Sequence, residues 1–208
     1  MHRLIFVPLI FLGSLAAQET APQPEFSFYD KLVEAAQFRS TQEVRYVADY
    51  VTLEYPGGDV PEKTGVCTDV VIRSYRARGL DLQVLVHEDM KTNFSKYPQN
   101  WDAPGTDRSI DHRRVPNLQR YFRRKGAELP ITDEIEDYQP GDVVAWDLNG
   151  NGLTHIGIVV TAPKGGKAGA WIVHNIGSGP RLDRRLFEWE IIGHYRFGEG
   201  VDKNYSNN

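Results

Sequence analysis

Apolar residues recur with helical spacing over much of the first 130 positions of this 208-residue chain. Ser27, with Asp30 three residues later, forms a capping-box pattern ahead of apolar residues at i, i+3, i+4 and i+7, which predicts a helix. The same spacing predicts three more helices, over about 67–78, 82–90 and 116–125. Glycine follows two of them directly, as expected for a helix end. Alternating apolar residues over 51–55 predict a short strand.

The hydrophobic pattern changes after Pro140, where short stretches are rich in β-branched and aromatic residues. These stretches predict four strands, over Val143–Trp146, Ile156–Val160, Ala170–Ile176 and His194–Phe197. The Asn-Gly-Asn-Gly sequence at 149–152 supplies a tight turn between the first two strands. Helices therefore come first and strands last, which predicts an α+β fold with N-terminal helices packed on a C-terminal antiparallel sheet.

The first 17 residues have the pattern of a secretory signal peptide: a basic start, an apolar run from Leu4 to Leu15, and small residues at its end. The run is shorter than the roughly 20 residues that a membrane-spanning helix needs. We therefore expect export to the periplasm or the extracellular space, with no stable membrane insertion after cleavage. The other predicted divisions are a short tether, a single domain and a flexible tail, at 18–26, 27–198 and 199–208.

Composition narrows the classes of function. The net charge of −4 provides no basic field, so we expect no nucleic-acid partner. Cys67 is the only cysteine, which excludes a disulfide framework. No His-x-x-x-His or Cys-x-x-Cys spacing indicates a metal site, and the turn at 147–152 resembles only half of a calcium loop, because Ile158 stands where that loop needs a glutamate. We expect neither a metal nor a cofactor.

A lone cysteine in an exported protein is buried and inert, paired between chains, or retained for its chemistry. Cys67 stands where the loop at 64–66 meets the start of a predicted helix. There the helix dipole and the free N–H groups stabilise a thiolate, which predicts a lowered pKa for the thiol. The same N–H groups are able to hold an oxyanion. Cys67 is therefore a candidate nucleophile.

A thiol nucleophile needs a base, and the base needs an orienting partner. His155 opens one predicted strand and His174 lies in the next, so the two side chains are expected to meet across the sheet. Neighbouring residues of a strand point to opposite faces, so only one of His174 and Asn175 is able to orient His155. The pattern alone does not decide between them.

Several motifs resemble those of the NlpC-type cysteine hydrolases, which are papain-like bacterial cell-wall enzymes. In chain order they are Gly-Val-Cys-Thr-Asp, Pro-Gly-Asp, His-Ile-Gly-Ile-Val and Val-His, at 65–69, 140–142, 155–159 and 173–174. The resemblance covers roughly residues 50–198. Asp-His-Arg-Arg-Val-Pro-Asn at 111–117 and His-Asn-Ile-Gly at 174–177 are similar to an uncharacterised family of exported bacterial proteins in the same superfamily.

The resemblance implies a papain-like fold and a role for each matching residue. It assigns Cys67 as nucleophile, His155 as general base and His174 as the orienting residue, with Asn175 as the alternative. A tyrosine about a dozen residues before the cysteine often lies near the oxyanion in this family, which implies that role for Tyr55. The implied reaction is hydrolysis of an amide or peptide bond, with peptidoglycan stem peptides as the substrate class.

The segment at 82–126 is longer than its counterpart in the family, which leaves the substrate open. Arginine forms bidentate pairs with carboxylates, so the segment is a candidate for holding a carboxylate of the peptide. A solvated basic helix face is the alternative interpretation. The candidate substrate-binding residues are Asp69, Trp101, Asp111, His112, Arg113 and Arg114.

Two other functions fit the same residues. The first is acyl transfer to an acceptor other than water. The second is a non-catalytic module that binds the cell envelope, in which case Cys67 is inert. The oligomeric state is open, with a monomer as the expectation.

Overall fold

A five-stranded antiparallel sheet carries the C-terminal part of the chain. The computed structural model describes residues 26–198, so the predicted signal peptide at 1–17, most of the tether and the tail at 199–208 lie outside the described residues. The strands are β3 (Val143–Asp147), β4 (Thr154–Val160), β5 (Trp171–Asn175), β6 (Pro180–Asp183) and β7 (Glu190–Tyr195). Their order in the sheet is β6-β5-β4-β3-β7, and each neighbouring pair is antiparallel.

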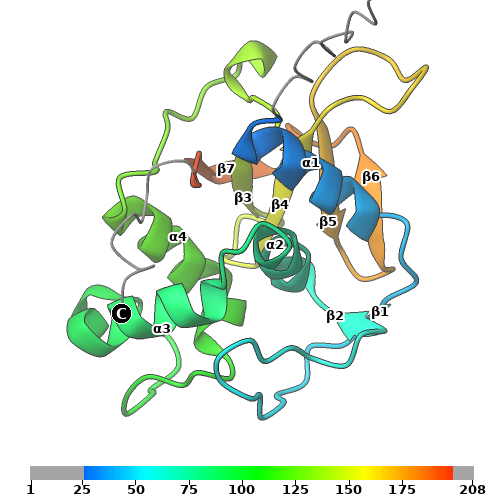
Figure 1. Ribbon diagram of the computed structural model, residues 1–208. Coiled ribbons are helices and arrows are strands. Elements are labelled where there is room, and N and C mark those ends of the chain that lie inside the picture. The colour runs from blue at the N-terminus through cyan, green and yellow to red at the C-terminus, as the bar shows by residue number, and fades with distance from the viewer. Residues whose placement is uncertain (1–25, 199–208) are drawn as a thin grey trace, which may run out of the picture.

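The helices precede the sheet in the chain and cover one of its faces (Figure 1). They are α1 (Phe28–Arg39), α2 (Cys67–Arg76), α3 (Leu82–Asn93) and α4 (Val115–Arg124). Helices α1 and α2 pack against β4 and β5, while α3 and α4 pack together beside them. A small parallel pair, β1 (Arg45–Tyr46) and β2 (Thr64–Gly65), leads into α2. The predicted α+β arrangement is confirmed.

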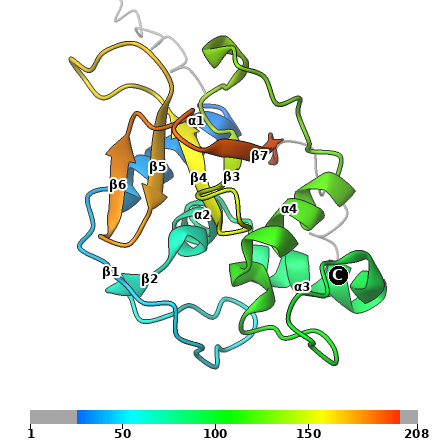
Figure 2. The same cartoon turned by 180° about the vertical axis from the view of Figure 1, so that it is seen from behind.

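The two faces of the sheet bury different groups of side chains. Ile156, Ile158 and Val173 belong to the main core, which they share with α1, α2, α3 and α4. The opposite face buries a smaller cluster, in which Trp146 packs with Leu186 from the segment between β6 and β7. Figure 2 shows this second face from behind, with β6 at one edge and β7 at the other.

The predicted helix boundaries are confirmed by the caps. The Asp30 N–H donates to the Ser27 hydroxyl at 3.1 Å, and the Asp30 carboxylate accepts from the Ser27 N–H at 3.0 Å. Gly79 and Gly126 adopt positive φ angles of 79° and 70° just beyond α2 and α4. Only glycine adopts that conformation without steric cost, so both residues end their helices.

Three predictions about strands were wrong or incomplete. Residues 51–55 form no strand; their backbone is held by side chains instead, as where the Leu53 N–H donates to the Ser109 hydroxyl. The last strand covers Glu190–Tyr195 rather than His194–Phe197. Strand β6 was not predicted, because every residue of this edge strand is half-buried and the alternation that identifies a strand is absent.

The Pro-Gly-Asp motif joins the start of β3 to its surroundings. Gly141 has a φ of 96°, and a Cβ there would lie 2.9 Å from the Tyr29 side chain, so only glycine fits. The Asp142 carboxylate accepts hydrogen bonds from His194 at 2.8 Å and from Arg196 at 2.6 Å. The motif therefore acts in folding, by tying β3 to β7.

Candidate active site

Cys67 is the first residue of α2, and its thiol lies against the start of β4. The backbone N–H groups of Ile156, Thr68 and Cys67 itself lie close enough to the sulfur to favour its thiolate. The residue is 6% exposed. Since Ile156 follows His155 directly, the thiol lies beside the peptide unit that carries the predicted base.

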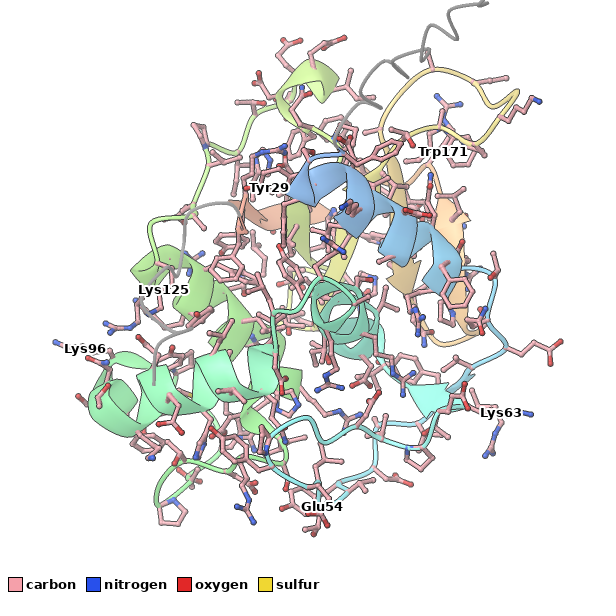
Figure 3. All side chains as sticks on the ribbon, in the orientation of Figure 1. Tyr29, Glu54, Lys63, Lys96, Lys125 and Trp171 are labelled. Atoms are coloured by element: carbon pink, nitrogen blue, oxygen red, sulfur yellow. The ribbon has the colours of Figure 1, made fainter. Side chains whose placement is uncertain are left out.

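His155 and His174 meet on the sheet as expected. The Nε2 atom of His155 lies 2.8 Å from Nδ1 of His174, and both residues are almost fully buried. The chain of contacts continues, because Nε2 of His174 lies 3.1 Å from the carboxylate of Asp183 on β6. His174 lies on β5, whose first residue, Trp171, is labelled in Figure 3 beside the loop that precedes the strand.

Asn175 lies on the opposite face of β5 and has a different role. Its amide nitrogen donates to the Gly65 carbonyl, and its amide oxygen accepts from the N–H groups of Gly177 and Gly179. The side chain thus fixes the turn after β5 and the strand before Cys67. His174, and not Asn175, is the residue that contacts His155.

The electrostatics of the thiol differ from the prediction. The pKa of Cys67 is raised to about 12, mainly by burial and to a smaller extent by the Asp69 carboxylate, and the N–H groups of Ile156, Thr68 and Cys67 only partly oppose this shift. The expected lowering by the helix N-terminus was therefore wrong, because loss of solvent outweighs the backbone hydrogen bonds. Burial also lowers the pKa of His155 to about 3. At neutral pH both the Cys67 thiol and the His155 imidazole are therefore uncharged in the folded protein.

Acid is expected to destabilise the fold through the buried histidines His155 and His112. Burial lowers the pKa of each to about 3, whereas an unfolded histidine titrates near 6.5. As the pH falls from about 6.5 toward 3, the unfolded state binds protons that the folded state refuses, which removes about 1.4 kcal/mol of stability per pH unit for each histidine. Burial raises the pKa of Asp111 to about 6, which opposes one of these contributions over part of the range.

A His112→Asn variant isolates one contribution. Urea unfolding at pH 7, 5 and 4 should show a dependence on pH that is weaker than in the parent by about 1.4 kcal/mol per unit. Equal dependences for both proteins would mean that the folded state protonates His112 as readily as the unfolded state does.

A pocket of about 230 Å³ opens beside Cys67. Trp101 and Arg114 form part of its wall, and the Arg114 guanidinium stacks over the Trp101 ring at 4.1 Å. Arg113 lines the pocket as well. The structure thus places three candidate substrate-binding residues, Trp101, Arg113 and Arg114, in the wall of the pocket beside the thiol. The two arginines are the charged residues of that wall.

The other candidate substrate-binding residues have structural roles. Asp69 is 2% exposed and makes a bidentate ion pair with Arg113, at 2.9 and 3.0 Å, while also accepting from the Val66 N–H. Asp111 accepts from the Asp107 N–H and is buried. His112 is buried too, and neither Asp111 nor His112 lines the pocket. A substrate-binding role for these three residues stays a prediction, since all three are buried and Asp69 lines a separate cavity of about 240 Å³ rather than the pocket beside Cys67.

Tyr55 does not line the pocket either. Its hydroxyl donates to Glu88 on α3 at 2.7 Å, and its ring packs against His87. Tyr46 lines the pocket instead, because β1 pairs Tyr46 with Gly65, two residues before Cys67. Tyr46 lies 21 positions before the cysteine, because a long segment separates the two short strands. The oxyanion role expected for Tyr55 stays a prediction.

Sequence reasoning also missed Asp183 and Trp189. Asp183 lies on the unpredicted strand β6. Trp189 packs within 6.1 Å of the His155 ring and 6.0 Å of the His174 ring. An edge strand without alternation and a tryptophan in a loop offer no sequence signal for either role.

Metal binding and membrane insertion require recognisable side-chain clusters and helices, and residues 26–198 show neither pattern. No group of three or more His, Cys, Asp or Glu side chains in this part of the chain is arranged to hold a metal ion. No helix there has the length and apolar character needed to cross a bilayer. The turn at 147–152 is a hairpin connection between β3 and β4, in which the Asp147 carboxylate accepts from the Gly152 N–H.

Comparison with known proteins gives a family, one relative in sequence and one similar solved structure. Residues 33–197 match the family described as "Domain of unknown function (DUF1287)". The chain is 44% identical over 187 residues to "Uncharacterized protein YijF" of Escherichia coli (strain K12), covering 89% of this chain and 90% of that protein. Among solved structures it is similar to NlpC1 from Trichomonas vaginalis, with 12% identity and a TM-score of 0.45 over 84% of this chain; it spans 46% of that chain. The match over most of the sequence shows that the chain belongs to the DUF1287 family.

Proposed function

We propose that the protein is an exported cysteine hydrolase that cleaves an amide bond. One observation carries this proposal: the Cys67 thiol, at a helix N-terminus, lies against the peptide unit that joins His155 to Ile156, and the His155 ring is hydrogen-bonded to His174. A nucleophile, a base and an orienting group in that order are the parts that thiol catalysis requires.

The chemistry follows from the neutral resting pair. Since Nε2 of His155 is engaged with His174, Nδ1 is the nitrogen left for the thiol. The Cys67 sulfur attacks the amide carbonyl carbon while its proton passes to His155 Nδ1. The C–N bond then breaks as His155 returns that proton to the leaving amine, which leaves a thioester. Water attacks the thioester with His155 as base, the C–S bond breaks, and the acid and the thiol are released.

We assign the oxyanion to the backbone N–H groups at the start of α2, because those of Cys67 and Thr68 lie near the sulfur. Tyr46, which lines the same pocket, is proposed as a further donor. The role of Tyr46 is tested by comparison with Tyr55, which does not line this pocket.

Tyr46→Phe is expected to lower kcat for amide hydrolysis by about 100-fold, the usual cost of losing one oxyanion donor. Tyr55→Phe is the matched control, because it removes a hydroxyl bonded to Glu88 outside the pocket, and it should change kcat by less than about threefold. Initial rates of both variants on the same substrate measure these two effects. Equal rates for the two variants would remove Tyr46 from the mechanism.

The pocket suggests what the substrate carries next to its scissile bond. Arg114 is 21% exposed and faces a cavity in which Trp101 supplies an apolar wall. An arginine beside an aromatic ring suits a planar carboxylate on a short peptide. Stem peptides of peptidoglycan have that chemistry, and the NlpC-type resemblance together with the predicted export favours them as the substrate class.

Mass spectrometry of purified muropeptides treated with the mature protein tests the proposal. Hydrolysis gives a new free acid and a new amine, with the gain of one water. A product that joins the acid to an added amine would indicate acyl transfer, which keeps Cys67 as nucleophile but replaces water as acceptor. Unchanged muropeptides that bind tightly to the protein would favour the envelope-binding module instead.

A further inference from the structure

We propose that Asp183 is a positioning residue that fixes which nitrogen of His174 and of His155 carries a proton. The inference rests on the proposed function, because that function makes His155 the base. Asp183 lies on β6 opposite Ile172, which places its side chain on the same face of the sheet as His174. Its Oδ2 atom lies 3.1 Å from His174 Nε2.

The hydrogen bonds that link His155, His174 and Asp183 fit one set of donors and acceptors. A carboxylate only accepts, so Nε2 of His174 must carry a proton and donate it to Asp183. Nδ1 of His174 is then a bare acceptor, and the 2.8 Å contact requires that Nε2 of His155 donate to it. Nδ1 of His155 is thereby left without a proton, which is the state that accepts the proton of Cys67.

Without the carboxylate, the opposite arrangement becomes available. A proton on Nδ1 of His174 would be donated to Nε2 of His155, and the remaining proton of His155 would sit on Nδ1. In that form His155 has no lone pair facing the thiol and does not act as a base. Asp183 therefore favours the protonation pattern in which His155 is a base, and it acts through the ring of His174.

The surroundings support this role. The two histidine rings are packed against Trp189, and the His155 ring also against Trp146, so solvent reaches them poorly. His174 has a fully buried side chain, whereas the Asp183 side chain is 25% exposed. The charged groups beside Asp183 are Arg181 and Arg185, with Nε atoms at 3.6 and 3.7 Å from the carboxylate. The Asp183 carboxylate is thus the partly exposed, charged end of a hydrogen-bonded series whose other two members, His174 and His155, are buried.

Nitrogen-15 NMR of the histidine rings, which requires no substrate, tests the inference in the full mature chain at pH 7.5. The wild-type protein should show His155 and His174 each as a single form with the proton on Nε2. In Asp183→Ala both rings should become mixtures of the two forms. Glu190→Ala, at an exposed carboxylate on the first residue of β7, is the control and should leave both rings as in the wild type.

Kinetics provide the second measurement. Asp183→Ala should lower kcat by about 10- to 100-fold with KM unchanged, and the acidic limb of the pH profile should shift to lower pH, because an imidazolium is harder to form without the carboxylate. A wild-type protein with the proton on Nδ1 of His155, or rings that do not respond to Asp183→Ala, would overturn the inference. Rings that respond as expected in a protein that cleaves no amide would support it and count against the hydrolase.

Discussion

Cys67→Ala is expected to abolish amide hydrolysis, with a loss on the order of 10⁴-fold or more, because it removes the sulfur that forms the acyl-enzyme in the proposed mechanism. The fold should survive, since the change removes one sulfur atom from the edge of the core and adds no charge. Product formation from muropeptides, followed by mass spectrometry, gives the rate, and circular dichroism shows whether the variant is folded.

The single cysteine makes the chemistry easy to follow. Iodoacetamide has one thiol to modify in this chain, so any added mass on a cysteine maps to Cys67. Because burial raises the pKa of that thiol to about 12, modification of the resting protein at pH 7 should be slow and should accelerate with rising pH. A modified protein that is still active, or a Cys67→Ala variant that hydrolyses at the parental rate, would place the nucleophile elsewhere.

A His155→Ala variant separates the base from the nucleophile. It leaves the α2 N–H groups around the sulfur unchanged, so a loss of activity comparable to that of Cys67→Ala would show that the two residues act as a unit. Near-parental hydrolysis would mean that another group takes the proton of the thiol.

The elements that the sequence predicts well share one property: their signals are local. A capping box at Ser27 and glycines just beyond α2 and α4 fix helix ends within a few residues. The alternation around His155 and His174 is enough to place both on adjacent strands, and their contact at 2.8 Å confirms that expectation. The alternation of side chains along a strand predicts that His174 and Asn175 point to opposite faces of the sheet, but only the structure shows on which face His155 lies.

What could not be predicted depends on contacts between distant segments. Tyr46 lies near Cys67 because a two-residue parallel pairing brings it there, and no periodicity reports such a short strand. Asp183 depends on β6, an edge strand without alternation. The raised pKa of Cys67 has the same origin, since the helix N-terminus is visible in the sequence but the packing of β4 over the thiol is not.

The buried ion pair between Asp69 and Arg113 provides the second large effect. It ties the first turn of α2 to the segment that walls the pocket, and the Thr68 hydroxyl adds a hydrogen bond to the Arg113 carbonyl. Both charged side chains are at most 3% exposed, so removing one partner leaves the other charged and buried. Arg113→Met keeps most of the volume but removes the charge, and it should lower the free energy of unfolding by about 3–5 kcal/mol.

The exposed pair between Arg123 and Glu128 is the matched control. Its Nε to Oε1 distance of 2.8 Å is as short as that of the buried pair, but its side chains are 36% and 52% exposed. Arg123→Met should therefore cost less than about 1 kcal/mol in the same urea titration. If Arg113→Met cost no more than the control, Asp69 would have to be neutral or solvated in the folded protein. A large cost in Arg113→Met that Asp69→Asn partly reverses would show instead that the unpaired buried carboxylate is its source, and that the pocket wall is held to α2 by charge.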